Sequence, residues 1–401
     1  MNPLQNPSTS HAHSPKKTDL DARPALQMDL DQIAAPLDTK LDLASKLFQR
    51  SIFPAASRVA EGGRLGSPLV VDLDPTTFCD LACPECISTQ VLNKGQFGPK
   101  RLIRLAEELC ESGVKAVILI GGGEPLIHQS TDRVIKTLYD SGVRVGMVTN
   151  GTLIDRHLDT LSHMMSWVRV SVDAATQPTY DLFRPSGRPK SVFPKLVANM
   201  RLLASVKRGR LGFSFLLMQR YDASGKLIAS NYDEVLEAGH LAKDIGCDYF
   251  EVKAMFDETH HIVSQSAASI DRVNGQLNSL RDLETPLFKV LASSTWHGLS
   301  SDESKVQTKL YSTCKIAELR TTITPSGVYT CAYHRGNDKA RIGDVGVTSF
   351  KEMWDNADVS RIDPRIDCTF HCARHKSNLA MEDKELMKNV RVLSDDYDPF
   401  I

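Results

Sequence analysis

The chain has 401 residues, enough for one large domain and a smaller one. Its apolar content of 41%, charged content of 24% and net charge of −1 are typical of a globular protein, with no general attraction to nucleic acid or to an anionic membrane. No apolar run reaches the ~18 residues that span a bilayer, and the N-terminus lacks the apolar core of a signal peptide. We therefore expect a cytoplasmic protein that binds neither membrane nor nucleic acid.

The first 65 residues divide into two parts. Residues 1–25 are rich in Ser, Pro, Lys, His and Asp, with little to bury, which predicts a disordered tail. Residues 26–65 carry apolar side chains at roughly helical spacing, interrupted at Pro36. This pattern predicts an N-terminal helical segment that packs on the core.

Strands and helices alternate through residues 66–260. Six short apolar runs are predicted as strands, at 69–74, 114–120, 143–148, 167–173, 211–218 and 248–253. Helical patterns separate them, which predicts a parallel sheet buried on both faces. Six such units indicate an α/β fold, a partial (β/α)6 TIM-like barrel, with functional residues at the C-terminal ends of the strands.

The remaining chain is expected to form three segments. Residues 261–310 are polar and helical in pattern, and are predicted to be a helical bridge. Residues 311–380 hold four cysteines among glycines and short strand-like runs, which predicts a small metal-binding domain. Residues 381–401 are predicted to be a C-terminal tail.

Cys79, Cys83 and Cys86 form a C-x3-C-x2-C motif directly after the first predicted strand. Three thiolates fit a cubane iron–sulfur cluster with one iron left open, whereas a structural zinc site requires four closed ligands. An open iron is a place for chemistry, so the motif indicates an enzyme.

Four later cysteines come in two pairs. Cys314 and Cys331 flank a predicted hairpin at 321–330, and Cys368 and Cys372 form a C-x3-C pair. Four thiolates complete a closed site for zinc or for a second iron–sulfur cluster, and the nearby triad favours the cluster. The odd total of nine cysteines in a chain with no export signal favours metal-bound thiols over disulfides.

Four motifs on successive strand ends together resemble the radical S-adenosylmethionine (SAM) superfamily. They are the cysteine triad, Gly121-Gly122-Gly123-Glu124-Pro125, Thr149-Asn150-Gly151 and Ser171-Val172-Asp173. Residues 311–380 resemble the SPASM/Twitch extension, which carries auxiliary iron–sulfur clusters, and four cysteines are similar to the shorter Twitch form.

The resemblance implies the cofactors and their contacts. A [4Fe-4S] cluster on the triad would bind SAM and cleave it to a 5′-deoxyadenosyl radical, with an electron from a flavodoxin- or ferredoxin-type donor. A second [4Fe-4S] cluster would occupy the four later cysteines. The three glycines would allow close approach of the methionine moiety, and Glu124 would accept from its ammonium group. The remaining implied SAM contacts are Asn150, Ser171, Asp173 and Arg184. The family's frequent aromatic residue before the third cysteine is Glu85 here.

Three further residues are candidates for catalysis. Glu251 and Lys253 alternate with apolar residues on the sixth predicted strand, as substrate contacts or as a structural ion pair. Either residue, or Arg184, could take a proton from a substrate alcohol. Cys247 is either a core residue or a hydrogen-atom donor. His334 and Arg335 could tune the second cluster or touch the substrate.

The second cluster favours net oxidation of a small polar metabolite such as a sugar or aminocyclitol, and the two cysteine pairs are similar to those of aminocyclitol dehydrogenases. One alternative is maturation of a ribosomal peptide by crosslinking, oxidation or epimerisation, in which Cys247 would donate hydrogen. Another is a non-catalytic iron–sulfur or zinc protein.

Overall fold

The computed structural model describes residues 43–257, 260–300, 308–393 and 398–401, which belong to one compact unit. The predicted disordered tail at 1–25 lies outside the described residues, as does the first part of the predicted helical segment at 26–65. The rest of that segment contains a 3-10 turn, η1 (Ser45–Phe48), and helix α2 (Phe53–Ala60). Among the described helices, none is both long and apolar enough to cross a membrane.

A ten-stranded sheet runs through the described residues in the order β12-β11-β10-β1-β2-β3-β4-β5-β8-β9. Its parallel strands are β1 (Val70–Leu73), β2 (Ala116–Leu119), β3 (Arg144–Thr149), β4 (Trp167–Ser171), β5 (Arg210–Leu217), β8 (Tyr249–Ala254), β9 (Lys289–Ala292) and β10 (Arg320–Thr324). The antiparallel strands β11 (Gly327–Tyr329) and β12 (Arg341–Gly343) complete one edge. The predicted α/β fold with a partial parallel barrel is confirmed, and all six predicted strands are present.

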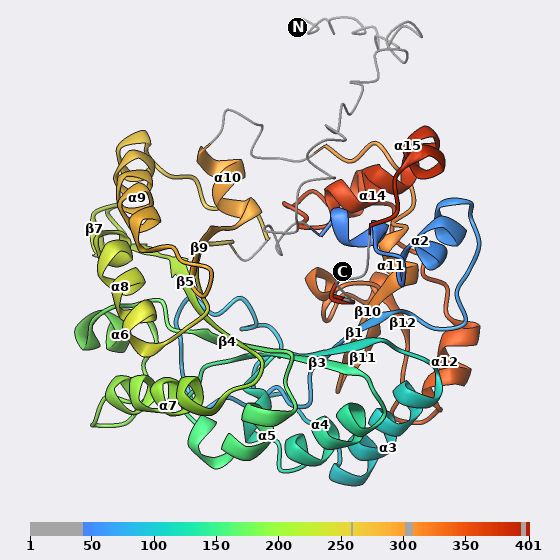
Figure 1. Cartoon of the computed structure of the whole chain (residues 1–401), viewed down its shortest axis with the longest axis horizontal. Coiled ribbons are helices and arrows are strands. Elements are labelled where there is room, and N and C mark those ends of the chain that lie inside the picture. Colours follow the sequence, from blue (N-terminus) through green and yellow to red (C-terminus); the bar gives the residue numbers. More distant parts are fainter. Residues whose placement is uncertain (1–42, 258–259, 301–307, 394–397) are drawn as a thin grey trace, which may run out of the picture. The chain divides into compact units, whose positions relative to one another are not determined.

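Helices cover the outer side of the curved sheet (Figure 1). They are α3 (Pro99–Glu111), α4 (Thr131–Asp140), α5 (Leu158–His163), α6 (Gln177–Phe183), α7 (Phe193–Val206) and α8 (Val235–Ile245). Helix α3 begins with proline at its first position and buries Leu102, Leu105 and Leu109, which share one helical face. The strands between these helices are consequently buried on their outer side.

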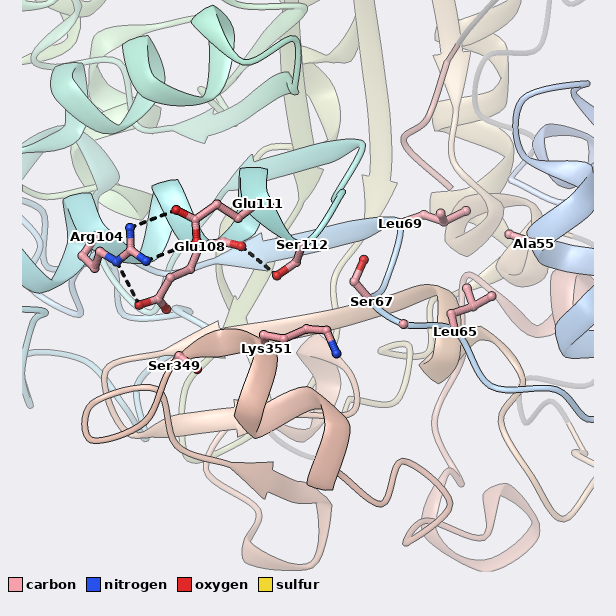
Figure 2. Close-up of a pocket in the computed structure, with 11 residues that line it drawn as sticks. Ala55, Leu65, Ser67, Leu69, Arg104, Glu108, Glu111, Ser112, Ser349 and Lys351 are labelled. Carbon is pink, nitrogen blue, oxygen red and sulfur yellow. Dashed lines mark hydrogen bonds and ion pairs between the residues drawn. The ribbon is translucent and has the colours of Figure 1, made fainter.

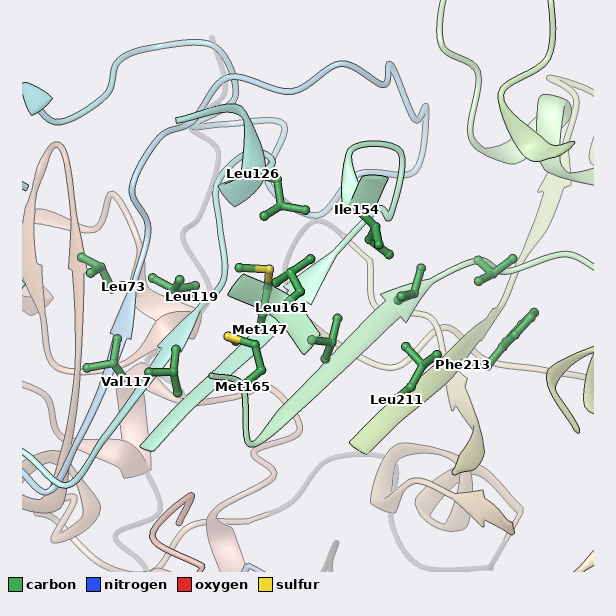
Figure 3. Close-up of a cluster of buried hydrophobic side chains, with 14 of the residues drawn as sticks. Leu73, Val117, Leu119, Leu126, Met147, Ile154, Leu161, Met165, Leu211 and Phe213 are labelled. Atoms are coloured by element: carbon green, nitrogen blue, oxygen red, sulfur yellow. The ribbon is translucent and has the colours of Figure 1, made fainter. Parts of the chain in front are cut away.

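Alternation along the strands separates an apolar side from a polar side. Val117, Leu119 and Phe213 point to the helices and belong to the main core (Figure 3). Because successive side chains on a strand point to opposite faces, Arg169 of β4 and Glu251 of β8 face the inner side of the barrel. The inner face of the barrel therefore carries charged groups, which would be unfavourable in an apolar core.

The prediction of a helical bridge at 261–310 accounts for only part of this segment. It contains α9 (Ala267–Leu280) and α10 (Ser294–Ser300), and between them β9, a seventh strand that pairs in parallel with β8. The sequence of β9 is only four residues long and lies between polar segments. It is too short to show the alternation of apolar and polar residues that identifies a strand. A hairpin of β6 (Gln219–Tyr221) and β7 (Leu227–Ser230) was also not predicted.

The segment at 311–380 is joined to the barrel sheet, because its strand β10 pairs with β1. Its helices are α11 (Ile316–Leu319), α12 (Phe350–Asn356), α13 (Pro364–Asp367) and α14 (His375–Glu382). The expectation of a C-terminal tail at 381–401 is wrong for its described part. It contains α15 (Lys384–Asn389), and Phe400 is buried with its ring 5.4 Å from that of Trp167.

Candidate active site

The loop that carries the first three cysteines follows β1, and Thr77 forms several of the hydrogen bonds that hold it. Thr77 accepts from the amides of Lys94 (2.8 Å) and Gly95 (2.9 Å), which closes the loop on itself. The amide of Cys79 donates to the side chain of Asn93, whose φ of 57° places it in the left-handed region. The loop is thereby folded back so that its cysteines lie beside the strand ends.

The three thiols of this loop are half-buried and electrostatically coupled. Burial raises the pKa of Cys79 to about 12, and neighbouring Glu124, Asp80 and Cys83 add to the rise. Burial also raises the pKa of Cys83, where the charges of Arg184 and Cys86 act in opposite directions. Thiolates held together in such surroundings need positive charge, which iron would supply. The triad therefore fits the predicted cluster.

The glycine-rich loop after β2 packs directly on the cysteine loop. A side chain at Gly123 would meet the carbonyl oxygen of Phe78 at 2.2 Å, so only glycine allows this approach. The next amide, of Glu124, donates to the same carbonyl at 2.8 Å. The two loops thus form one unit, in which a substitution at Gly123 would push them apart.

Glu124 is buried and joins the ends of β2 and β3. Its carboxylate accepts from the amide of Leu126 (3.0 Å), the hydroxyl of Thr149 (2.7 Å) and the amide of Asn150 (2.7 Å). Burial raises its pKa to about 7, although these bonds oppose the rise. The predicted contact of Glu124 with SAM remains a prediction, and the structure adds a role in fixing Asn150.

Asp80 is a member of the site that sequence reasoning missed. It accepts from the side chains of Asn150 (2.7 Å) and Thr152 (2.7 Å), and Asn150 also approaches the sulfur of Cys79 at 3.9 Å. Asp80 lies inside the C-x3-C segment, but both of its partners follow it by about 70 residues in the sequence. It ties the cysteine loop to the end of β3.

Asp173 and Arg184 form a buried ion pair next to the triad. The Nε of Arg184 donates to Asp173 at 2.6 Å, and the amide of Leu216 donates to the other carboxylate oxygen at 2.6 Å. Burial alone would lower the pKa of Arg184, but the negative charges of Asp173 and Cys83 have a larger effect and raise this pKa. Arg184 is therefore a fixed cation beside Cys83, unsuited to accept a proton. Ser171 lies half-buried at the end of β4.

A second charged cluster lies on the inner face of the barrel. Glu251 contacts Lys253 (3.1 Å) and Arg169 (3.4 Å), a residue that the sequence reasoning did not select. Burial favours neutral Glu251, but Lys253 and Arg169 outweigh it and lower its pKa. Burial and Arg169 lower the pKa of Lys253 to about 8, against the pull of Glu251 and Asp173. Lys253 is thus the better proton acceptor of the pair.

Cys247 does not belong to this cluster. It precedes β8, at the N-terminal end of that strand, whereas Lys253 lies near the C-terminal end. Its thiol is buried in the main core, and burial followed by the charge of Asp248 raises its pKa. The hydrogen-donor role considered for Cys247 is therefore unsupported, and its core role fits.

The four later cysteines lie near one another and receive hydrogen bonds to sulfur. These bonds include one from the amide of Tyr333 to Cys331 (3.3 Å), one from Asn378 to Cys314 (3.5 Å) and one between His334 Nε2 and Cys368 (3.4 Å). Burial raises the pKa of Cys314 to about 11 and of Cys331 to about 12, and Cys372 adds to both. Burial, and then the other three thiols, also raise the pKa of Cys368.

The predicted cluster at these four thiols remains a prediction, with zinc as its alternative. In the described part of the chain, no three His, Cys, Asp or Glu side chains converge closely enough to hold one metal ion. A zinc ion would draw its thiolates within ~2.3 Å of one point, whereas a four-iron cluster spreads its ligands around a larger body. All nine cysteines lie in the described residues, and no disulfide joins them.

A surface groove of about 630 Å³ lies elsewhere, between the end of α3 and the start of α12 (Figure 2). Its charged residues are already paired, Arg104 with Glu111 (3.0 Å) and Glu108 with Arg101 (2.9 Å). None of the predicted site residues lines it. The groove is therefore not the candidate site.

The fold and the cysteine loop define a partial α/β barrel with a cysteine-rich site at its first strand end. Residues 73–218 match the family described as the radical SAM superfamily. Residues 73–218 therefore form a radical SAM domain, the domain that binds a [4Fe-4S] cluster and SAM in that superfamily.

Known relatives agree with this assignment. An AdoMet-dependent heme synthase of Methanosarcina barkeri is 23% identical over 316 residues, covering 74% of this chain and 84% of the relative. Among solved structures, Streptococcus suis SuiB bound to S-adenosylmethionine has a TM-score of 0.56 at 14% identity, covering 76% of this chain and 69% of SuiB. The anSMEcpe structure with bound AdoMet has a TM-score of 0.52 at 13% identity, covering 82% of this chain and 93% of anSMEcpe. The structural likenesses show the fold.

Proposed function

We propose that this enzyme removes two electrons from a small polar metabolite, such as a sugar or aminocyclitol, with an auxiliary [4Fe-4S] cluster as acceptor of one of them. The ligands of that cluster would be Cys314, Cys331, Cys368 and Cys372. The observation that supports this proposal most is the charged cluster of Arg169, Glu251 and Lys253 on the inner face of the barrel. Charged groups there suit a polar substrate.

When bound, the triad cluster and SAM supply a 5′-deoxyadenosyl radical that removes a hydrogen atom from the substrate. Lys253, with its pKa of about 8, takes the hydroxyl proton from the same carbon centre. The hydrogen atom and the proton together leave one electron behind, for which the four-cysteine site is the proposed acceptor. The substrate alcohol thereby becomes a carbonyl, having lost two hydrogens overall.

The residues around the triad have separate proposed roles. Asp80 and Glu124 orient Asn150 toward the ligand, and the pair of Asp173 with Arg184 places a cation next to Cys83 for the SAM carboxylate. A flavodoxin- or ferredoxin-type protein in the cytoplasm would supply the electron for SAM cleavage.

A second candidate function is maturation of a peptide. SuiB has been solved bound to the precursor peptide SuiA. The β6–β7 hairpin supports this candidate, because Tyr221 and Ile228 are exposed apolar residues on it and Arg220 ties it to Glu85 of the cysteine loop at 2.5 Å. An exposed apolar hairpin beside the triad suits an extended chain.

Deuterium labelling distinguishes these functions. The reconstituted enzyme is incubated with SAM, reductant and aminocyclitols or sugars that carry deuterium on carbon, and in a parallel arm with the unlabelled compounds in D2O. We expect deuterium in 5′-deoxyadenosine and an oxidised product two mass units below the unlabelled substrate. Solvent deuterium in an otherwise unchanged product would indicate epimerisation and contradict the proposal.

A further inference from the structure

A buried ion pair connects the barrel to the segment with the four later cysteines. Asp74, directly after β1, receives two bonds from Arg335, from Nε at 2.7 Å and from Nη2 at 3.0 Å. Asp74 is fully buried, and Arg335 lies four residues after Cys331. A two-pronged arginine–carboxylate contact fixes orientation as well as distance.

Each partner of this pair is attached to one of the two cysteine sites. Asp74 accepts from the amide of Gly122 in the glycine-rich loop at 3.1 Å. Arg335 donates to the carbonyl of Ala332 at 3.0 Å, inside the turn that begins at Cys331. An unbroken set of hydrogen bonds therefore runs from the glycine-rich loop to that turn.

Packing around Val91 reinforces the same connection. Val91 lies in the loop after the third cysteine of the triad. A side chain on Gly122 would meet Val91 at 2.9 Å, and one on Gly336 would meet it at 3.5 Å. The two loops and the turn after Cys331 thus share one contact point next to the ion pair.

We infer that Arg335 is a positioning residue that, through Asp74, fixes the glycine-rich loop relative to the four-cysteine site. A disturbance at Cys331 is therefore transmitted to the loop that we propose holds SAM. This inference rests on the proposed function, because it assigns clusters to both sites.

A second ion pair provides a matched control. Asp72 and Arg320 are joined by two bonds of 2.6 and 3.0 Å, and Asp72 is also buried. The pair likewise links β1 to the C-terminal segment, but the remaining bond of Arg320 goes to the carbonyl of Ile401, away from the glycine-rich loop. Breaking it removes a neighbouring buried ion pair but leaves the bond between Asp74 and Gly122 in place.

The test is a double-mutant cycle on ligand binding in the anaerobically reconstituted full chain. Calorimetry measures the dissociation constant of S-adenosylhomocysteine, which is not cleaved. We expect Arg335→Gln to weaken binding about tenfold. Cys331→Ala should weaken binding severalfold in the wild-type background and have no added effect beside Arg335→Gln. In the Arg320→Gln background its effect should persist.

Equal effects of Cys331→Ala with and without Arg335 would overturn the inference, as would no effect in the wild type. If Arg335→Gln fails to fold because Asp74 is left unpaired, the cycle is run with Asp74→Asn and Arg335→Gln together, which removes the buried charge. An enzyme that makes 5′-deoxyadenosine but shows no coupling refutes this inference alone. An enzyme without iron or without 5′-deoxyadenosine refutes the proposed function.

Discussion

The two cysteine sites differ in what surrounds their sulfurs. At the triad, the carboxylates of Asp80 and Glu124 lie near Cys79, which has contacts with the amide of Leu81 and, at 3.9 Å, with Asn150. At the later site the sulfurs of Cys314, Cys331 and Cys368 are among those with hydrogen bonds, at 3.3–3.5 Å. Hydrogen bonds to sulfur stabilise added negative charge and raise the reduction potential of a cluster. The hydrogen bonds to sulfur at the later site support the accepting role that we propose for it.

The aromatic surroundings differ in the same sense. Tyr333 packs against Phe370 at 4.9 Å between ring centres, and Phe256 and His334 join them at the later site. Beside the triad, Phe78 and Ile87 are exposed. An open site suits a ligand that must enter, and an enclosed one suits electron transfer.

Removing one triad ligand should have the largest effect. Cys79→Ala should abolish formation of 5′-deoxyadenosine from SAM and dithionite, because two thiolates no longer hold the cluster. Liquid chromatography of the nucleoside measures this. Cys110→Ala, which changes a half-buried thiol in α3, should leave it unchanged. Substantial nucleoside from Cys79→Ala would refute the role of the triad.

Removing one ligand of the later site should separate SAM cleavage from oxidation of the substrate. Cys314→Ala should retain part of the 5′-deoxyadenosine formation but lose the oxidised product, because the substrate electron has no acceptor. Its iron content should fall from about eight to about four per chain. Normal product yield from this variant would contradict an accepting role.

The charge of Lys253 should make turnover depend on pH. Because Lys253 accepts a proton only when neutral, and its pKa is about 8, the rate should rise about tenfold per pH unit below pH 8 and level off above it. Lys253→Met should lower turnover about 100-fold and remove this rise. Lys207→Met is the control, because Lys207 pairs with Asp248 at the N-terminal end of β8. An unchanged dependence of the rate on pH in Lys253→Met would exclude Lys253 as the base.

The ion pair of the β6–β7 hairpin should have the smallest effect. Arg220→Ala removes the contact with Glu85 near the triad, and we expect a loss of about 1 kcal/mol of unfolding free energy. Arg272→Ala, which breaks an exposed pair with Asp233, should cost less. Urea unfolding measures both, and a loss of several kcal/mol in Arg220→Ala would show that the hairpin holds the cysteine loop in place.

Sequence patterns predicted the parts of the site that depend on local spacing. The cysteine triad, Glu124 and Asn150 could be placed at strand ends, because short apolar runs predict strands and turn residues mark where they end. Arg169 and Asp80 could not be selected, since their importance comes from partners distant in sequence. The same holds for β10, whose pairing with β1 joins segments some 250 residues apart.

The central claim is that one chain holds two iron–sulfur clusters, of which only the triad cluster cleaves SAM. The most direct measurement is iron and zinc content after anaerobic reconstitution, followed by nucleoside analysis with SAM and dithionite. We predict about eight irons per chain and formation of 5′-deoxyadenosine. About one zinc per chain with no nucleoside would contradict the account.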